Sequence, residues 1–179
     1  MARVRVSRLK GDATVVQSGK TIVDKLLGQM GVDAISSITK GSSEPDGVYF
    51  IELTGDDSGL LIGRRGETLR AFQFLTNLLL YRQFPESSGR VIVDVEGYRK
   101  RREKSLQDLA QRVASQVASS ARTIILEPMP ANERRVIHMA LSDHPRVVTE
   151  SVGIGDDRKV SIALKNDDRP PPVRNTLPS

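Results

Sequence analysis

The order of hydrophobic and polar positions along the first hundred residues alternates between helical and extended periodicity. Apolar residues spaced three and four apart indicate helices, and runs rich in β-branched and aromatic residues between turn-forming residues indicate strands. The predicted elements are a helix over 21–30 capped by Ser18 and stopped by Gly31, strands over 34–39 and 48–53 around a turn at 41–47, a helical turn over 56–61, an apolar helix over 67–81 and a strand over 90–95. This order predicts an α+β domain whose small sheet is covered by helices on one side.

The character of the sequence changes after Gly97, which predicts a second small α+β domain. Its predicted elements are a helix from Tyr98 with an apolar stripe through Leu106, Leu109, Ala110, Val113 and Val117, a strand over 124–126, a helix over 131–142, and strands over 146–151 and 159–164. The predicted divisions of the chain are a basic arm or single edge strand over 1–17, domains over 18–97 and 98–165, and a disordered proline-containing tail over 166–179.

The most informative motif is Ile62-Gly63-Arg64-Arg65-Gly66, which lies between an apolar segment and a predicted helix. Glycine allows the backbone to turn tightly and to approach a ligand closely. The loop leads into a helix N-terminus, where free N–H groups and the helix dipole favour anions, and the two arginines add permanent positive charge. This chemistry suits a phosphodiester backbone; the alternative is a structural turn between two helices. Arg70, in the first turns of the following helix, joins the candidate binding residues.

Two further groups of basic residues are candidates. Arg99, Lys100, Arg101 and Arg102 form a basic run at a helix start, where cations are slightly unfavourable, so both a phosphate-facing role and a solvated helix start stay open. Arg134 and His138 share one helix face at positions i and i+4, with Arg135 beside them. Taken alone, this pair fits a surface arginine and a partly buried histidine. A binding role for the pair is favoured only by the sequence segments on either side of it, which are described next.

The full IGxxGxxL pattern, with a hairpin before it and a strand after it, resembles a type II KH domain, whose order is helix, strand, strand, helix, GxxG, helix, strand. The resemblance implies that Gly63 to Gly66 clamp the backbone of about four nucleotides, with Ile62 lining the groove for the bases. The segments around Arg134 and His138 resemble an R3H domain, a class known to bind single-stranded nucleic acids. This implies a phosphate contact from Arg134 with His138 as its neighbour; a fold-stabilising role for the pair stays open.

A KH domain followed by an R3H domain, over about residues 20–164, resembles the Jag/KhpB family of bacterial RNA-binding proteins. The resemblance implies single-stranded RNA as a partner, a small single-KH protein as a second partner, and a role in RNA regulation, cell division or cell-envelope homeostasis. Many members carry a further N-terminal Jag-N domain, for which residues 1–17 are too short, so we expect it to be absent. The alternative function is a protein-interaction adaptor associated with the membrane-protein insertion machinery.

Composition narrows these possibilities. An excess of 27 Lys and Arg over 22 Asp and Glu agrees with a polyanion partner, although it leaves open whether DNA is also bound. The absence of cysteine and the presence of only two histidines argue against disulfides, thiolate catalysis and the usual zinc sites. We therefore expect no catalytic residues, no cofactor and no metal, with an enzyme as a distant alternative. The lack of a signal peptide or a long apolar run predicts a cytoplasmic protein without membrane insertion.

Overall fold

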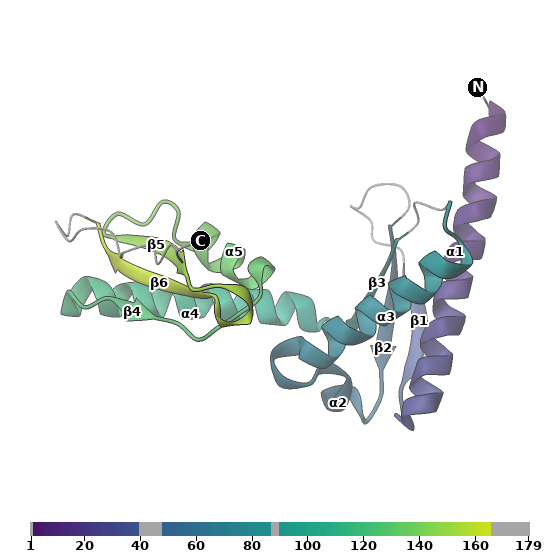
Figure 1. The fold of residues 1–179 in the computed structure, drawn as a ribbon, viewed down its shortest axis with the longest axis horizontal. Helices are drawn as coiled ribbons and strands as arrows, with labels where there is room; N and C mark the ends of the chain where they lie inside the picture. Colours follow the sequence, from purple (N-terminus) through teal and green to yellow (C-terminus); the bar gives the residue numbers. More distant parts are fainter. Residues whose placement is uncertain (1, 40–47, 87–89, 166–179) are drawn as a thin grey trace, which may run out of the picture. The chain divides into compact units, whose positions relative to one another are not determined.

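The structure, a computed structural model, describes residues 2–39, 48–86 and 90–165 (Figure 1). The predicted turn over 41–47 and the predicted tail over 166–179 lie outside these residues. The chain divides into two compact units, residues 1–99 and residues 100–179. They are called the first and the second unit below. Across the described ranges, no helix is both long and apolar enough to cross a membrane.

The first unit is a three-stranded sheet with two long helices on one face (Figure 1). Its elements are α1 (Ala2–Met30), β1 (Ile35–Thr39), β2 (Val48–Thr54), α2 (Ser58–Ile62), a 3₁₀ turn (Arg64–Gly66), α3 (Glu67–Gln83) and β3 (Arg90–Val95). The strand order is β1-β2-β3, with β1 antiparallel and β3 parallel to β2. The predicted hairpin and the predicted α+β architecture are therefore confirmed.

The first half of α1 corrects the prediction of a basic arm or edge strand, because residues 2–17 are helical. Ser18 consequently lies inside the helix and is not its N-cap. The helix continues across this point because Val15 and Val16 are buried. Gly19 lies so close to β3 that an added Cβ would be 2.8 Å from Cγ2 of Val91. Packing against the sheet thus stabilises helix where the apolar periodicity of the sequence is weak.

The core of the first unit lies between the sheet and the two long helices. The alternating side chains of β2 and β3 that face the helices are fully buried: Ile51, Leu53, Val91, Val93 and Val95. From α3, this core receives Leu69, Phe72 and Leu80, and the buried Thr76 hydroxyl donates to the carbonyl of Phe72. The remaining apolar side chains of α3 point away from this core.

The outer edge of β3 is bonded to side chains. Gln73 bridges two of its residues, because its Nε2 donates to the Val91 carbonyl at 2.6 Å and its Oε1 accepts from the Val93 N–H at 2.8 Å. Asn77 Oδ1 accepts from the Val91 N–H, and Arg99 Nε donates to the Val93 carbonyl. These bonds satisfy the backbone groups that a further strand would otherwise pair with.

The second unit packs two helices against one face of a second sheet. It contains most of α4 (Tyr98–Ser120), whose first two residues belong to the first unit. The other elements are β4 (Ile124–Ile125), α5 (Ala131–Ala140), β5 (Val147–Val152), a 3₁₀ turn (Gly155–Asp157) and β6 (Lys159–Leu164). The strands run antiparallel in the order β4-β6-β5. Helix α5 ends two residues before the predicted boundary, because the chain turns at Leu141, which is buried in the core.

Candidate nucleic-acid interface

The glycine loop, defined as Gly63–Gly66, has an unusual backbone. Gly63 has φ 66° and ψ −170°, Arg65 has φ 53° and ψ 33°, and Gly66 has φ 76° and ψ 17°. A positive φ is uncommon for a residue with a Cβ, so the left-handed conformation of Arg65 carries strain. Such residues persist where the surrounding structure holds them, and they gather at binding sites.

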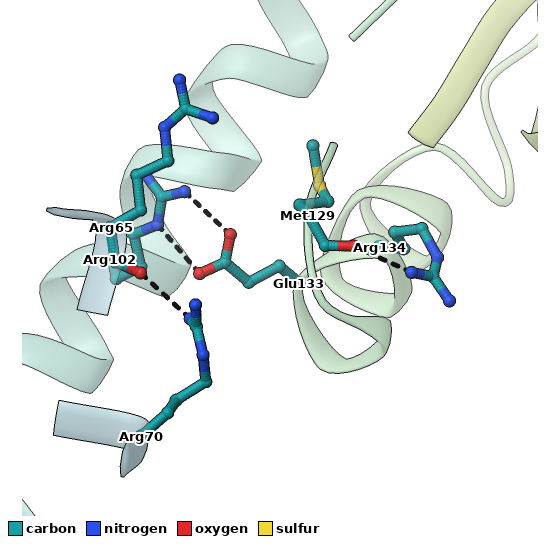
Figure 2. Close-up of polar contacts among 6 residues, drawn as sticks. All are labelled: Arg65, Arg70, Arg102, Met129, Glu133 and Arg134. Carbon is teal, nitrogen blue, oxygen red and sulfur yellow. Dashed lines mark hydrogen bonds and ion pairs between the residues drawn. The ribbon is translucent and has the colours of Figure 1, made fainter. Parts of the chain in front are cut away.

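Both glycines of the loop are required by space as well as by φ. A Cβ on Gly63 would overlap the side chain of Thr68, and one on Gly66 would lie 2.8 Å from Cε1 of Tyr98. Arg70 holds the segment between them, because its Nη1 donates to the carbonyl of Arg65 at 3.0 Å (Figure 2). Arg70, predicted as a binding residue, therefore supports the shape of the loop.

The glycine loop delivers its backbone to the N-terminus of α3. Gly66 is the N-cap of this helix, and within the described residues no side chain caps it. A helix of 17 residues carries positive partial charge at this end, where its first N–H groups are available to an anion. Arg64 is exposed beside it, and Ile62 is half-buried against the first core. The arrangement matches the chemistry of a phosphate site.

The basic run at the start of α4 separates into two kinds of residue. Arg99 is tied to the first unit, with Nε donating to the Val93 carbonyl at 3.2 Å and Nη2 to Gln73 Oε1 at 3.1 Å. Arg102 forms a two-pronged ion pair with Glu133, at 3.1 Å and 2.7 Å (Figure 2). Lys100 and Arg101 are exposed.

Both side chains of the predicted Arg134 and His138 pair are bonded within the protein. Arg134 Nη1 donates to the carbonyl of Met129 at 2.8 Å (Figure 2). His138 bridges α5 to β5, with Nδ1 2.6 Å from Thr149 Oγ1 and Nε2 2.8 Å from Ser151 Oγ. The pair thus has a structural function whether or not it also contacts a ligand.

The bonding partners of His138 and of Arg102 are not among the residues predicted from the sequence. Thr149 and Ser151 are polar positions two apart on β5, on the same face as the buried Val147. Polar residues on the face of a strand that begins with a buried residue are the signal that could have identified them. Glu133 carries no such signal, because it is buried and its partner Arg102 lies on another helix, 31 positions away. Arg135, beside the anchored pair, is exposed.

Burial lowers the pKa of the His138 imidazole, and the positive charge of Arg134 lowers this pKa further. The folded second unit therefore binds fewer protons than the unfolded chain around the ordinary histidine pKa of about 6.5. We expect the free energy of unfolding of this unit to fall as the pH is lowered through that value, and to be restored above it. Denaturant unfolding at about pH 5.5 and about pH 8 measures the effect.

Replacement His138→Asn provides the control for this pH dependence, because asparagine can bond to a hydroxyl but does not titrate. The variant should be less stable at both pH values and should lack most of the difference between them. An unchanged pH dependence in His138→Asn would show that other groups cause it.

The two units define a class: a KH domain followed by an R3H domain. Residues 20–95 match the KhpA/KhpB KH-domain family, and residues 104–164 match the R3H-domain family. Neither is an enzyme family. With relatives aligned over most of its length, the chain belongs to the KhpB family, as the resemblance to Jag/KhpB proteins predicted.

Three relatives are named RNA-binding protein KhpB. The protein from Clostridium symbiosum is 35% identical over 164 residues, which cover 92% of this chain and 72% of the relative. The protein from Bacillus subtilis (strain 168) is 38% identical over 148 residues, covering 82% of this chain and 67% of the relative. The protein from Lactiplantibacillus plantarum is 36% identical over 107 residues, covering 60% of this chain and 33% of the relative.

Proposed function

We propose that this chain binds single-stranded RNA and that the glycine loop clamps the RNA backbone. The observation that carries the proposal is the loop itself. It is a strained turn held by Arg70, and it places exposed Arg64 next to the N-terminus of α3, which no described side chain caps. The names of the relatives support RNA as the polyanion. Because these contacts address the backbone, base specificity should be modest.

The R3H domain adds a second contact patch in this proposal. One nitrogen of Arg134 is bonded to the Met129 carbonyl, which orients the guanidinium, and a guanidinium has further donors for a phosphate. Arg135 and His138 lie on the same helix, and exposed Lys100 and Arg101 carry further positive charge. Two weak sites in one chain bind a single strand more tightly than either alone, because the second contact forms at high effective concentration.

The test is a titration of the intact protein with a pool of single-stranded RNA at several salt concentrations. The logarithm of the binding constant should fall against the logarithm of salt with a slope of about −0.7 for each phosphate neutralised. A parallel titration with DNA of the same sequences compares the two backbones. Absence of binding at low salt would refute the proposal, and cleavage of the RNA during incubation would indicate an enzyme.

A second function, association with a small single-KH protein, is favoured by the α3 face. This surface consists of the exposed apolar side chains on the side of α3 opposite the core: Phe74, Leu75, Leu78 and Tyr81, with Leu79 at its border. Phe74 and Tyr81 are 65% and 63% exposed, and a continuous apolar helix face of this kind is typical of a protein interface.

We expect Phe74→Glu/Leu78→Glu to abolish association with such a partner, because two charges would be buried without partners in the interface. Since both side chains are exposed, the free energy of unfolding should change by less than about 0.5 kcal/mol. Sedimentation of mixtures with the partner measures association. The matched control is Ile125→Glu/Ile154→Glu, which places two charges on exposed apolar positions of the second unit. Equal loss in both variants would contradict an α3 interface.

The cellular role that we propose follows from the family. In this proposal the protein is cytoplasmic and acts in RNA regulation connected with cell division or cell-envelope homeostasis. An adaptor role at the membrane-protein insertion machinery is the alternative, in which the α3 face rather than the glycine loop would be the main binding surface. Variants of the glycine loop and variants of the α3 face, compared in a functional assay in cells, distinguish the two roles. The RNA role requires the loop, and the adaptor role requires the α3 face.

A further inference from the structure

A fixed turn after β3 determines where Tyr98 lies. Glu96 and Gly97 both have positive φ, 51° and 67°, which sends the chain sharply away from the strand. The Glu96 N–H donates to the Leu53 carbonyl at 3.1 Å, and its carboxylate accepts from Ser58 Oγ at 2.6 Å. The Gly97 N–H donates to a carboxylate oxygen of β2, Glu52 Oε1, at 2.9 Å. The turn is thus bonded at each residue.

The residue that follows Tyr98 in the chain, Arg99, is bonded to β3 as well. The backbone N–H of Arg99 donates to Asp94 Oδ1 at 3.2 Å, and the Arg99 guanidinium is bonded to the edge of β3. The Tyr98 side chain packs against the core of the first unit. A residue between two bonded neighbours, with its ring against a core, has little freedom to move.

The Tyr98 ring stands directly against the glycine loop. A Cβ built on Gly66 would lie 2.8 Å from ring atom Cε1, 3.1 Å from the hydroxyl oxygen and 3.3 Å from Cζ. The ring therefore covers the side of Gly66 from which a side chain would project. Gly66 is also the N-cap of α3, so its left-handed conformation determines the direction of the first free N–H groups of that helix.

We propose that Tyr98 is a positioning residue of the RNA-binding loop, outside the GxxG motif: its ring is the wall that keeps Gly66 in the conformation that binds the backbone. This inference rests on the proposed function. Without the wall, Gly66 would sample both signs of φ, and RNA would have to order the loop on binding. The main contribution comes from the flat ring, because ring atom Cε1 is nearest to Gly66, with the hydroxyl oxygen next to it.

The experiment compares Tyr98→Phe and Tyr98→Leu in the full chain. Phenylalanine keeps the ring, so affinity for a pool of single-stranded RNA should stay within about twofold of the original. Leucine keeps an apolar contact with the core but removes the flat wall. We expect roughly tenfold weaker RNA binding, the effect of losing one positioned contact. The same leucine change in an Arg64→Asp/Arg65→Asp background should cause no further loss, because the loop no longer contributes there.

A readout without RNA separates this inference from the proposed function. Amide hydrogen exchange at residues 63–66 should accelerate in Tyr98→Leu and stay unchanged in Tyr98→Phe, while exchange in β2 and β3 is retained in both. If the protein binds no RNA but the loop loosens in this way, the positioning role stands and the RNA function fails. If loop exchange is unchanged in Tyr98→Leu, or if RNA binding weakens equally in the arginine double variant, the inference is overturned. General acceleration across β2 and β3 would also overturn it, because it would show a role in the core.

Discussion

Replacing both loop arginines by aspartate, Arg64→Asp/Arg65→Asp, is expected to remove most of the affinity of the intact protein for single-stranded RNA. Two charge-assisted contacts would be lost and two carboxylates placed against phosphates, so binding should weaken roughly a hundredfold. The salt dependence should become shallower by about 1.4, which corresponds to two phosphates at 0.7 each. A fluorescence titration at two salt concentrations measures both quantities.

The matched control for this variant carries the same change of charge at the opposite end of α3. Lys25 and Arg82 line an apolar groove between α1 and the C-terminal end of α3, far from the glycine loop along that helix. Lys25→Asp/Arg82→Asp should bind RNA more tightly than the loop variant at each salt concentration. If the two variants bind alike, net charge rather than the loop governs affinity, and the clamp hypothesis fails.

The largest effect on stability is expected at the ion pair between Arg102 and Glu133. The Glu133 side chain is 6% exposed and the Arg102 side chain 24% exposed, so removal of one partner leaves a charge in a poorly hydrated site. Glu133→Gln keeps the shape and removes the charge, and it should destabilise the second unit by about 3 kcal/mol. Amide hydrogen exchange measures this, because it reports the opening of each unit separately.

An exposed ion pair provides the comparison. Lys20 and Asp24 lie one helical turn apart on α1 with side chains 28% and 47% exposed. Lys20→Ala should therefore cost no more than about 0.5 kcal/mol, since exposed pairs contribute little. Replacing both members of the first pair, Arg102→Met/Glu133→Leu, should recover most of the loss caused by Glu133→Gln. Similar costs for Glu133→Gln and Lys20→Ala would contradict the assigned importance of burial.

Features that depend on local chemistry were predictable from the sequence. The glycine loop was found because only glycine tolerates the backbone at Gly63 and Gly66, and the hairpin was found because its strands are rich in β-branched and aromatic residues. The helix carrying Arg134 and His138 followed from its apolar spacing. In each case a short stretch of sequence contains the whole physical reason.

Features that depend on distant contacts were not predictable in this way. Residues 2–17 show weak periodicity, and their helix depends on burial of Val15 and the approach of Gly19 to β3. The arginines are the clearest case, because sequence gives their charge but not their partners. Arg102 bonds to Glu133, 31 positions away, and Arg99 bonds to Gln73, 26 positions away. Composition alone counts them as available for phosphate, whereas the fold assigns them bonds within the protein.

The bonded outer edge of β3 has a consequence for self-association. Unpaired strand edges are where folded proteins recruit other strands and aggregate. Gln73, Asn77 and Arg99 close one edge of the sheet with side chains. Among the described strands of this sheet, a foreign strand can therefore add only along β1. Two copies that joined through β1 would form a continuous sheet with both outer edges closed. Growth would stop at the pair, so this sheet is protected from open-ended β-polymerisation.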